Sequence, residues 1–418
     1  MSGYSQFLKI SYLEPQSHVV NYQTEFKLPD NVVCSPSLRI GNLGLESSTF
    51  AGSANYAISG VSSLIKNIYL YSDRMLIDKI SNFGHFDATF KQLQNSNQTN
   101  KNIQQVLNKS SVGYSLDDKQ QFSGNGIHSR ISNSGSEDKC GYIELASHFN
   151  VLRSMPVIDT SKLKNFRVVI EWQKNNLYYL RNHTDQVFQQ KSPTLIYDVI
   201  INPQVAMAQS KALGNFNFMS LEHDSIIIPA NTSLPSVQKT QKQLKGFNNK
   251  LVEKMVLIKQ YQNDLLAKSS TNIIGLGPYK SPVQYNEQVQ VKINGRPLFD
   301  SPVDKEVVRV LHTDNAWGPR NVMPYAQSLS IGLNNVNDGL VNFVGIPSDS
   351  EQIANSSYFG FQVLNKIKDL EIEYERESPS DSNATIKVYS EAMTLHAYGT
   401  VQKQMVFGKN GDFMVSYV

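Results

Sequence analysis

The residues best suited to bind a metal ion are eight histidines, and their spacing gives no sign of a metal site. Zinc sites commonly use two histidines close in sequence, as in His-x-His or His-x-x-x-His, because that spacing aims both rings at one ion. Neither spacing occurs among His18, His85, His128, His148, His183, His223, His312 and His396. We therefore expect no metal site, and we expect His223 to form a surface pair with the adjacent Asp224.

One segment, Gly275–Ser281 with the sequence GLGPYKS, superficially resembles a phosphate-binding loop. Such a loop needs glycine directly before its lysine, so that successive backbone N–H groups can surround a phosphate, and a helix after it. Here Pro278 removes one N–H donor, Tyr279 precedes Lys280, and the following residues favour a strand. The segment is therefore interpreted as an ordinary turn.

Catalytic patterns are also missing from the sequence. No Gly-x-Ser-x-Gly motif positions a nucleophilic serine. The acidic pairs Asp117–Asp118 and Glu137–Asp138 lie in stretches rich in Ser, Asn and Gly, where neighbouring carboxylates are usually just solvated. We predict no catalytic residue and no cofactor, and expect the protein not to be an enzyme.

Two cysteines, Cys34 and Cys140, are too few for a disulfide scaffold or a four-ligand zinc site. We expect two ordinary thiols in a reducing compartment, although a pairing stays open if the fold brings them together. The N-terminus has no secretory signal pattern, and no window approaches the ~18 apolar residues of a membrane span.

The charge balance gives little reason to expect nucleic-acid binding. The 418 residues carry a formal net charge of +3, and only 18% of them are charged. No dense block of Lys and Arg occurs, so we expect no sequence-specific contact with nucleic acid. Hydrophobic residues make up 40% of the chain, which is enough for a sizeable core.

The elements that must position these residues are strands, because apolar residues recur with a period of two. Alternation of this kind runs through Val20–Leu28, Phe166–Trp172 and Leu370–Glu375. One face of each strand is then buried and the other solvated, as in an antiparallel sheet packed on a second sheet. Most tyrosines and phenylalanines fall on these strand patterns, which favours a role in the core or at a subunit interface.

Turn residues agree with strands joined by hairpins. Asn294–Gly295 and Asn410–Gly411 each separate two apolar runs, and Asn-Gly tolerates the positive φ angles of a type I′ turn. Ser72–Arg74 is predicted to close a third hairpin. Helical signals are few: Asp304 can cap a short helix over Lys305–Leu311, and Gln92–Leu107 is predicted to be a surface insertion with a helical turn or two.

A domain boundary is predicted near Gly214. The segment Asn202–Gly214 has small residues and no period of two, and strand patterning resumes at Phe216. Each half has about 200 residues, which suits one β-sandwich. We predict a first domain over residues 1–214 and a second over residues 215–418.

The order of these segments resembles the double jelly-roll major capsid proteins of double-stranded DNA viruses, especially those of polinton-like viruses and virophages. The stretches that carry the resemblance are Ser62–Ile80 with Asn82–Phe86, Tyr142–Leu145 with Met155–Ile158 and Leu163–Trp172, Val289–Phe299, and Ala392–Val418. The resemblance spans nearly the full chain. It implies an all-β fold of two tandem eight-stranded antiparallel jelly rolls with few short helices.

The resemblance also implies a function in a virion. Three copies would form a pseudo-hexameric capsomer, and capsomers would tile an icosahedral shell and contact penton and minor capsid or cement proteins. An internal membrane is compatible with this arrangement but is not indicated. Two long segments, Gln94–Asp138 and Ser233–Leu244, are expected to be loops in tower, rim or inter-capsomer positions.

Two other functions stay open from the sequence. A minor β-rich virion protein of a penton or spike would need only one roll, which the second sandwich after Phe216 argues against. A two-domain carbohydrate-binding protein would expose tryptophans and pair carboxylates across a cleft. Only Trp172 and Trp317 occur, and Trp172 has the phase of a core residue.

Overall fold

The structure is a computed structural model, and it describes ten segments of the chain. These are residues 8–44, 60–91, 140–173, 189–230, 236–261, 287–304, 306–318, 358–378, 392–408 and 412–418. The predicted Gln92–Leu107 insertion, the Gln94–Asp138 loop, both acidic pairs and the Gly275–Ser281 turn lie outside the described residues.

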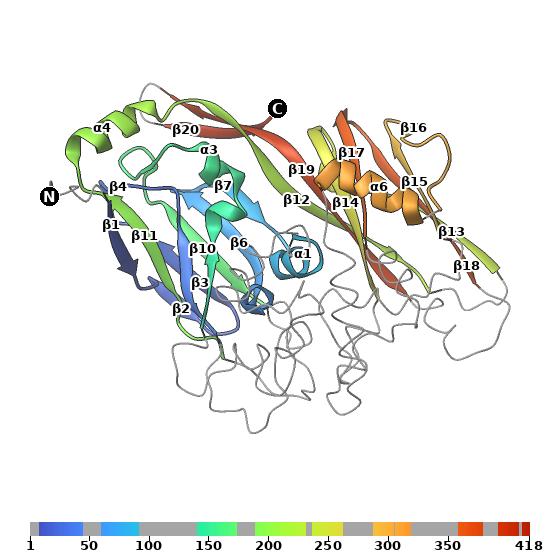
Figure 1. Ribbon diagram of the computed structural model, residues 1–418, viewed down its shortest axis with the longest axis horizontal. Helices are drawn as coiled ribbons and strands as arrows, with labels where there is room; N and C mark the ends of the chain where they lie inside the picture. The colour runs from blue at the N-terminus through green and yellow to red at the C-terminus, as the bar shows by residue number, and fades with distance from the viewer. Residues whose placement is uncertain are drawn as a thin grey trace, which may run out of the picture.

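The first half of the described chain forms two antiparallel sheets (Figure 1). One sheet contains β1 (Leu8–Leu13), β4 (Val33–Cys34), β5 (Arg39–Leu43), β8 (Gly141–Glu144), β9 (Ile158–Asp159) and β11 (Thr194–Ile200). Its order is β8-β5-β11-β4-β9, and β1 pairs with β11. The other contains, in spatial order, β2 (Ser17–Val19), β3 (Gln23–Lys27), β10 (Arg167–Trp172), β6 (Ile65–Ser72) and β7 (Met75–Ile80).

The second half forms two more antiparallel sheets. The first contains β12 (Phe216–Ile228), β19 (Met393–Phe407), β14 (Lys250–Tyr261) and β17 (Tyr358–Ile367) in that order, with β20 (Phe413–Tyr417) paired to β19. The second contains β13 (Ser236–Gln243), β18 (Leu370–Ser378), β15 (Glu287–Ile293) and β16 (Arg296–Pro297). The prediction of two antiparallel sandwiches is confirmed. The described strands of the first half exceed the eight expected because three of them, β2, β4 and β9, have only two or three residues.

Four α-helices occur in the described residues: α1 (Phe83–Thr89), α3 (Asn150–Ser154), α4 (Pro203–Ala212) and α6 (Glu306–Trp317). Short 3₁₀ turns cover Gly60–Leu64, Leu145–Ser147 and Lys245–Phe247. No helix in the described part of the chain is both long and apolar enough to cross a membrane.

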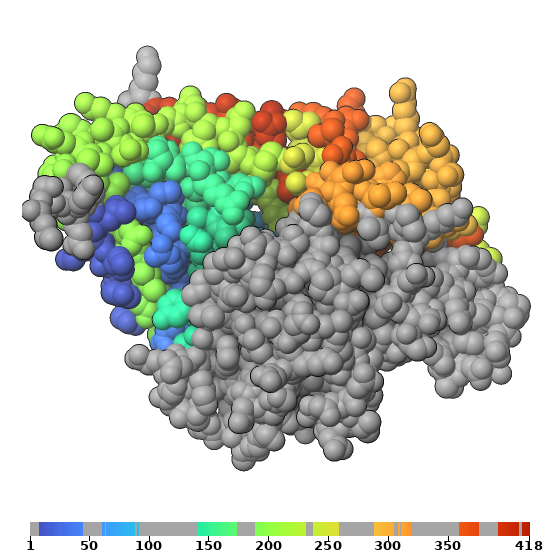
Figure 2. Space-filling view, in the orientation of Figure 1, coloured from blue at the N-terminus to red at the C-terminus, as the bar shows by residue number. Residues whose placement is uncertain are grey.

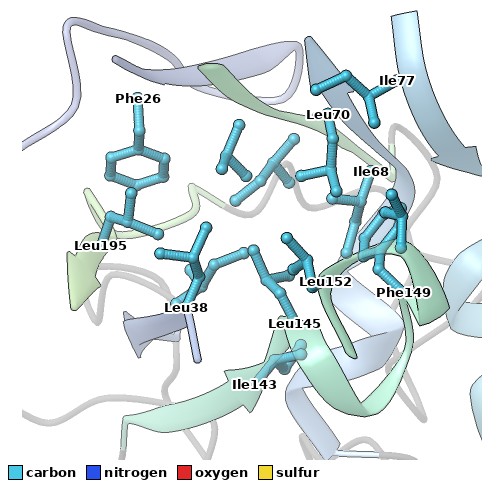
Figure 3. Close-up of a cluster of buried hydrophobic side chains, with 14 of the residues drawn as sticks. Phe26, Leu38, Ile68, Leu70, Ile77, Ile143, Leu145, Phe149, Leu152 and Leu195 are labelled. Carbon is cyan, nitrogen blue, oxygen red and sulfur yellow. The ribbon is translucent and has the colours of Figure 1, made fainter. Parts of the chain in front are cut away.

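The core of the first half lies between its two sheets. Figure 3 shows Phe26, Ile68 and Leu70 of one sheet pointing toward Ile143 and Leu195 of the other. Val168, Ile170 and Trp172 of β10 are fully buried, as their alternation predicts. The Trp172 indole N–H donates to Thr24 Oγ1 at 2.8 Å, so this buried donor is satisfied.

A second core lies between the two sheets of the second half. Val252 of β14 and Phe361 of β17 pack in one cluster with Val291 of β15 and with Ile372 and Tyr374 of β18. The buried residues of β18 alternate with partly exposed glutamates, which confirms the period of two predicted for Leu370–Glu375.

The predicted hairpins are confirmed where the structure describes them. β6 and β7 pair across a turn at Asp73, and β15 and β16 pair across Asn294–Gly295, whose φ angles are 53° and 76°. β19 pairs with β20, but the predicted turn Asn410–Gly411 lies outside the described residues.

Three boundary predictions are wrong. The segment Ser233–Leu244 is not a loop, because Ser236–Gln243 forms β13 and pairs with β18. The strand expected from Val20 begins at Gln23, since Asn21 adopts a φ of 59° in a turn. The helix expected to end at Leu311 continues to Trp317. The indole ring of Trp317 packs against an aromatic ring outside this helix.

The helix α4 occupies the segment that sequence analysis treated only as a boundary. Asn202 caps it, because the Asn202 Oδ1 accepts from the backbone N–H of Gln204 and of Val205, and Pro203 suits the first helical turn. Residues of α4 and β12 (light green) and of the C-terminal strands (red) form one continuous edge of the molecule (Figure 2). The boundary at Gly214 itself stays a prediction.

Candidate functional site: the seam between the two halves

Two long strands connect the halves. β12 and β19 pair without interruption from Phe216 opposite Met405 to Ile228 opposite Met393. At one end Phe218 and Met405 belong to the core of the first half, and at the other end Ile228 and Met393 belong to the second core. We call the surface where β12, β19 and β20 meet β7 and α1 the seam (Figure 1).

A cluster of four charged side chains lies in the seam. Lys403 of β19 places its Nζ 3.3 Å from Asp78 Oδ1 of β7 and 2.9 Å from Glu222 Oε1 of β12. Lys250 Nζ of β14 lies 3.5 Å from the other Glu222 oxygen. Tyr417 of β20 donates its hydroxyl to Glu222 Oε1 at 2.8 Å. We call Asp78, Glu222, Lys250 and Lys403 the charge cluster.

The charge cluster is self-neutralising, because it has two carboxylates and two ammonium groups. Burial raises the pKa of Asp78, although Lys403 and Ser220 act in the opposite direction. Burial disfavours the ammonium of Lys403, but Asp78 and Glu222 outweigh it and raise the pKa of Lys403. Burial likewise opposes the charge of Glu222, yet Lys403 and Lys250 hold the pKa of Glu222 below its usual value.

Three histidines meet beside this cluster, and each comes from a different element. His85 lies on α1, His223 on β12 and His396 on β19. The ring centroids of His85 and His396 are 4.5 Å apart, and those of His223 and His396 are 5.3 Å apart. His223 Nε2 lies 3.0 Å from His396 Nδ1, and His85 Nδ1 lies 2.8 Å from the Tyr398 hydroxyl. We call these three residues the histidine cluster.

His85 and His396 are buried, His223 is partly buried, and all three rings are neutral near pH 7. Burial lowers the pKa of His85 to about 3, with a further contribution from His223. Burial lowers the pKa of His223 to about 4, which Asp224 partly opposes. Burial also lowers the pKa of His396 well below its ordinary value. The predicted surface pair of His223 and Asp224 is wrong: His223 packs against Tyr398 with ring centroids 4.6 Å apart, and Asp224 Oδ2 accepts from the Gly246 N–H.

Aromatic rings complete the seam on the other side of α1. Trp317 of α6 packs edge-on against Phe90 at 5.0 Å, and Phe86 packs against Tyr398 at 4.9 Å. The Trp317 indole N–H donates to the Met255 carbonyl at 2.9 Å. Lys254 lies 4.8 Å above the Trp317 ring, a cation–π contact. Thus α1 of the first half is held between β19 and α6 of the second half.

The other histidines that the structure describes lie apart from this cluster. His18 bonds to Thr24, His148 contacts Phe83 and Lys91, and His312 packs among Phe299 and Phe359. His128 and His183 lie outside the described residues. Within the described segments, no three His, Cys, Asp or Glu side chains are arranged to hold a metal ion.

Both cysteines are buried and free. The Cys34 thiol donates to the Ile158 carbonyl at 3.6 Å, and burial raises the pKa of Cys34 to about 12. A thiol with so high a pKa is a poor nucleophile. Cys34 and Cys140 are not paired with each other in the structure.

The charge cluster is absent from the predictions made from the sequence, and the prediction for His223 is wrong. The sequence does contain a signal for the charge cluster, because Lys403 has the same strand phase as buried Val401 and Met405. A charged residue on a core phase is buried only when it is paired. The charged side chains of the seam therefore neutralise one another and hold strands of both halves together.

No family model matches the sequence, and no curated protein matches it. Solved structures do match. The capsid protein VP54 of PBCV-1, fitted into a reconstruction of the virophage Sputnik, aligns with a TM-score of 0.59 at 9% identity and covers 100% of this chain and 99% of that chain. The Faustovirus major capsid protein aligns with a TM-score of 0.53 at 9% identity and covers 98% of this chain and 92% of that chain.

The mavirus major capsid protein aligns at 0.53 with 8% identity and covers 99% of this chain and 90% of that one. All three alignments include both pairs of sheets and the seam. The chain has the double jelly-roll fold. In a double jelly roll of this kind, the seam is the contact that keeps the two rolls side by side.

Proposed function

We propose that this double jelly roll is the major capsid protein of a double-stranded DNA virus. Three copies form a pseudo-hexameric capsomer, and capsomers tile an icosahedral shell in the virion. The function resides in shape and contact surfaces rather than in catalysis. The observation that carries the proposal is the likeness in fold to three viral capsid proteins, which covers 98–100% of this chain.

A row of exposed apolar side chains supports contacts with neighbouring copies. Leu8, Ile10 and Tyr12 alternate along β1 with exposed fractions of 47%, 55% and 70%, so they share one face. Val19 of β2 and Tyr22, which follows β2 in the chain, are also more than half exposed. Contiguous exposed apolar residues on a sheet edge are typical of a surface that another protein covers.

The oligomeric state in solution tests the proposal. Light scattering on the purified full chain should give three times the 46.9 kDa of one chain, about 140 kDa. A three-fold ring requires two different patches on each copy, because each subunit contacts its neighbours head to tail. A stable monomer that binds a sugar would contradict the proposal and favour the carbohydrate-binding alternative.

The partners beyond the trimer follow from the same proposal. Neighbouring capsomers, penton proteins and minor capsid or cement proteins would contact the outer flanks. We propose no sequence-specific nucleic-acid contact, since the chain has a net charge of only +3. Cross-linking of intact particles, followed by identification of the linked peptides, should connect β1 residues to a second copy.

A further inference from the structure

The contact between two rings of the histidine cluster depends on a nitrogen that carries no proton. His223 Nε2 and His396 Nδ1 lie 3.0 Å apart, and a hydrogen bond between two rings needs one protonated and one bare nitrogen. The third ring is tied to the same strand, because His85 Nδ1 lies 2.8 Å from the Tyr398 hydroxyl, which also accepts from Asn82 Nδ2 at 3.0 Å. Full protonation would put N–H against N–H between His223 and His396.

We propose that the histidine cluster is an acid-sensitive contact that holds the two jelly rolls together near neutral pH and releases α1 from β12 and β19 when the rings take up protons. The seam lies within one chain, so this contact is independent of assembly into a capsid. The three rings would carry like charges with neighbouring centroids 4.5 Å and 5.3 Å apart. Repulsion at such distances is strong in a buried site.

Groups from several elements face the three rings. From β7, Lys79 faces His223 and disfavours its protonated form, whereas Asp224 of β12 favours it. From β19, the neighbouring Tyr398 supplies a hydroxyl, and Asn82, directly before α1, supplies an amide. From β14, Val256 and Ile258 lie opposite Tyr398 and His396, and Lys254 lies over Trp317. The effects of Asp224 and Lys79 on the charge of His223 therefore oppose each other.

The direction of the pH effect follows from the lowered pKa values of the cluster. An unfolded histidine has a pKa of about 6.5, so the unfolded chain binds protons that the folded seam does not. Stability is full above pH 6.5 and falls as the pH drops toward the pKa values of about 4 for His223 and about 3 for His85. The Glu222 carboxylate loses its stabilising contribution as the pH falls through its own pKa, which Lys403 and Lys250 hold below the usual value.

Trp317 reports on this contact because it packs against Phe86 of α1 and against Phe90, which directly follows α1. The other tryptophan, Trp172, is fully buried in the first core. In a Trp172→Phe chain, acrylamide quenching of Trp317 should rise at least about twofold between pH 7.5 and 4.5, while the far-ultraviolet circular dichroism stays unchanged. If that variant does not fold, the signal of Trp317 is obtained by subtracting the fluorescence of the Trp317→Phe variant from that of the unsubstituted chain.

Two substitutions separate the cluster from other titrating groups. His223→Gln removes one of the three titrating rings and should move the midpoint of the quenching transition down by about half a pH unit and make it less steep. His312→Gln is the matched control, because His312 is also half-buried but lies among Phe299 and Phe359. It should leave the transition unchanged.

His148 is also buried with a lowered pKa, but it lies on the first half beside Lys91 and Asp87 and is intact in both variants. Quenching that stays flat from pH 7.5 to 4.5 would overturn the proposal. Equal shifts in His223→Gln and His312→Gln would also overturn it, because the response would then not belong to the cluster.

Discussion

At the scale of single residues, the seam is organised around Lys403. Its ammonium lies within 3.3 Å of carboxylates from two strands that belong to different halves, and its side chain is only 7% exposed. A buried ion pair costs desolvation on both sides, so its net contribution to stability can be small. Removal of only one member of such a pair, however, leaves its partner buried without that opposite charge.

We expect Lys403→Met to lower the free energy of unfolding by about 3–5 kcal/mol, because Asp78 and Glu222 would stay buried without their shared cation. Urea unfolding at pH 7.5 measures the change. Lys239→Met is the matched control, since Lys239 pairs with Glu375 on the surface with 78% of its side chain exposed. That exposed pair should contribute less than about 1 kcal/mol. Equal effects of the two substitutions would contradict the assignment of the seam.

A second residue-scale prediction concerns Glu222 and acid. Lys403 and Lys250 outweigh burial and lower its pKa, so its stabilising effect is present above the unfolded value and is lost as the pH falls through the folded one. Glu222→Gln should therefore lose less stability between pH 5 and pH 3 than the unsubstituted chain loses. Urea midpoints at the two pH values measure the difference. An identical loss in both proteins would show that Glu222 is not ionised in the seam.

At the scale of elements, β12 and β19 serve both rolls. Phe218 and Met405 are 3% and 0% exposed within the first core, although their strands pair in a sheet of the second half. Partly buried Phe216, Leu221 and Phe407 pack against the same core. The first roll is therefore completed by strands that come after the predicted boundary at Gly214.

It follows that a fragment of residues 1–214 should not form a stable fold by itself. Without β12 and β19 its core would expose the surfaces that Phe218 and Met405 cover, and such patches favour aggregation. A fragment that aggregates, or that shows no cooperative thermal transition by circular dichroism, is the expected result. A soluble fragment with a sharp transition would contradict the shared core. The full chain, purified alongside, is the control.

Strands with a clear period of two were predictable from sequence. The contribution of one strand to both cores and the presence of mostly polar strands were not. In β10 the burial of Val168, Ile170 and Trp172 follows directly from alternation. β13 was missed because its residues are mostly polar, so its pairing with β18 left no apolar pattern. The histidine cluster could not be inferred, since His85, His223 and His396 are brought together only by the packing of α1 on two long strands.

At the scale of the whole molecule, the seam makes one body from two sandwiches. The double jelly roll places β1 and β2 at one end of the long axis and β13, β16 and β18 at the other (Figure 1). A ring of three copies can then join the free flank of one chain to a different flank of the next. The apolar face of β1 has the character of such a flank.

A substitution on that face tests its role in assembly. Ile10→Asp places a charge at a residue that is 55% exposed, so the single chain should keep its stability while the trimer weakens. Light scattering should show a larger share of single chains, and the thermal midpoint of the dissociated protein should be unchanged. Trimers that persist at the same concentration would exclude β1 from the contact.

Electron microscopy of the purified full chain in negative stain tests the central claim most directly. The account predicts particles with a hexagonal outline and three-fold symmetry, in which six jelly rolls from three chains surround one axis. Single elongated particles with two lobes, at every concentration tried, would contradict it.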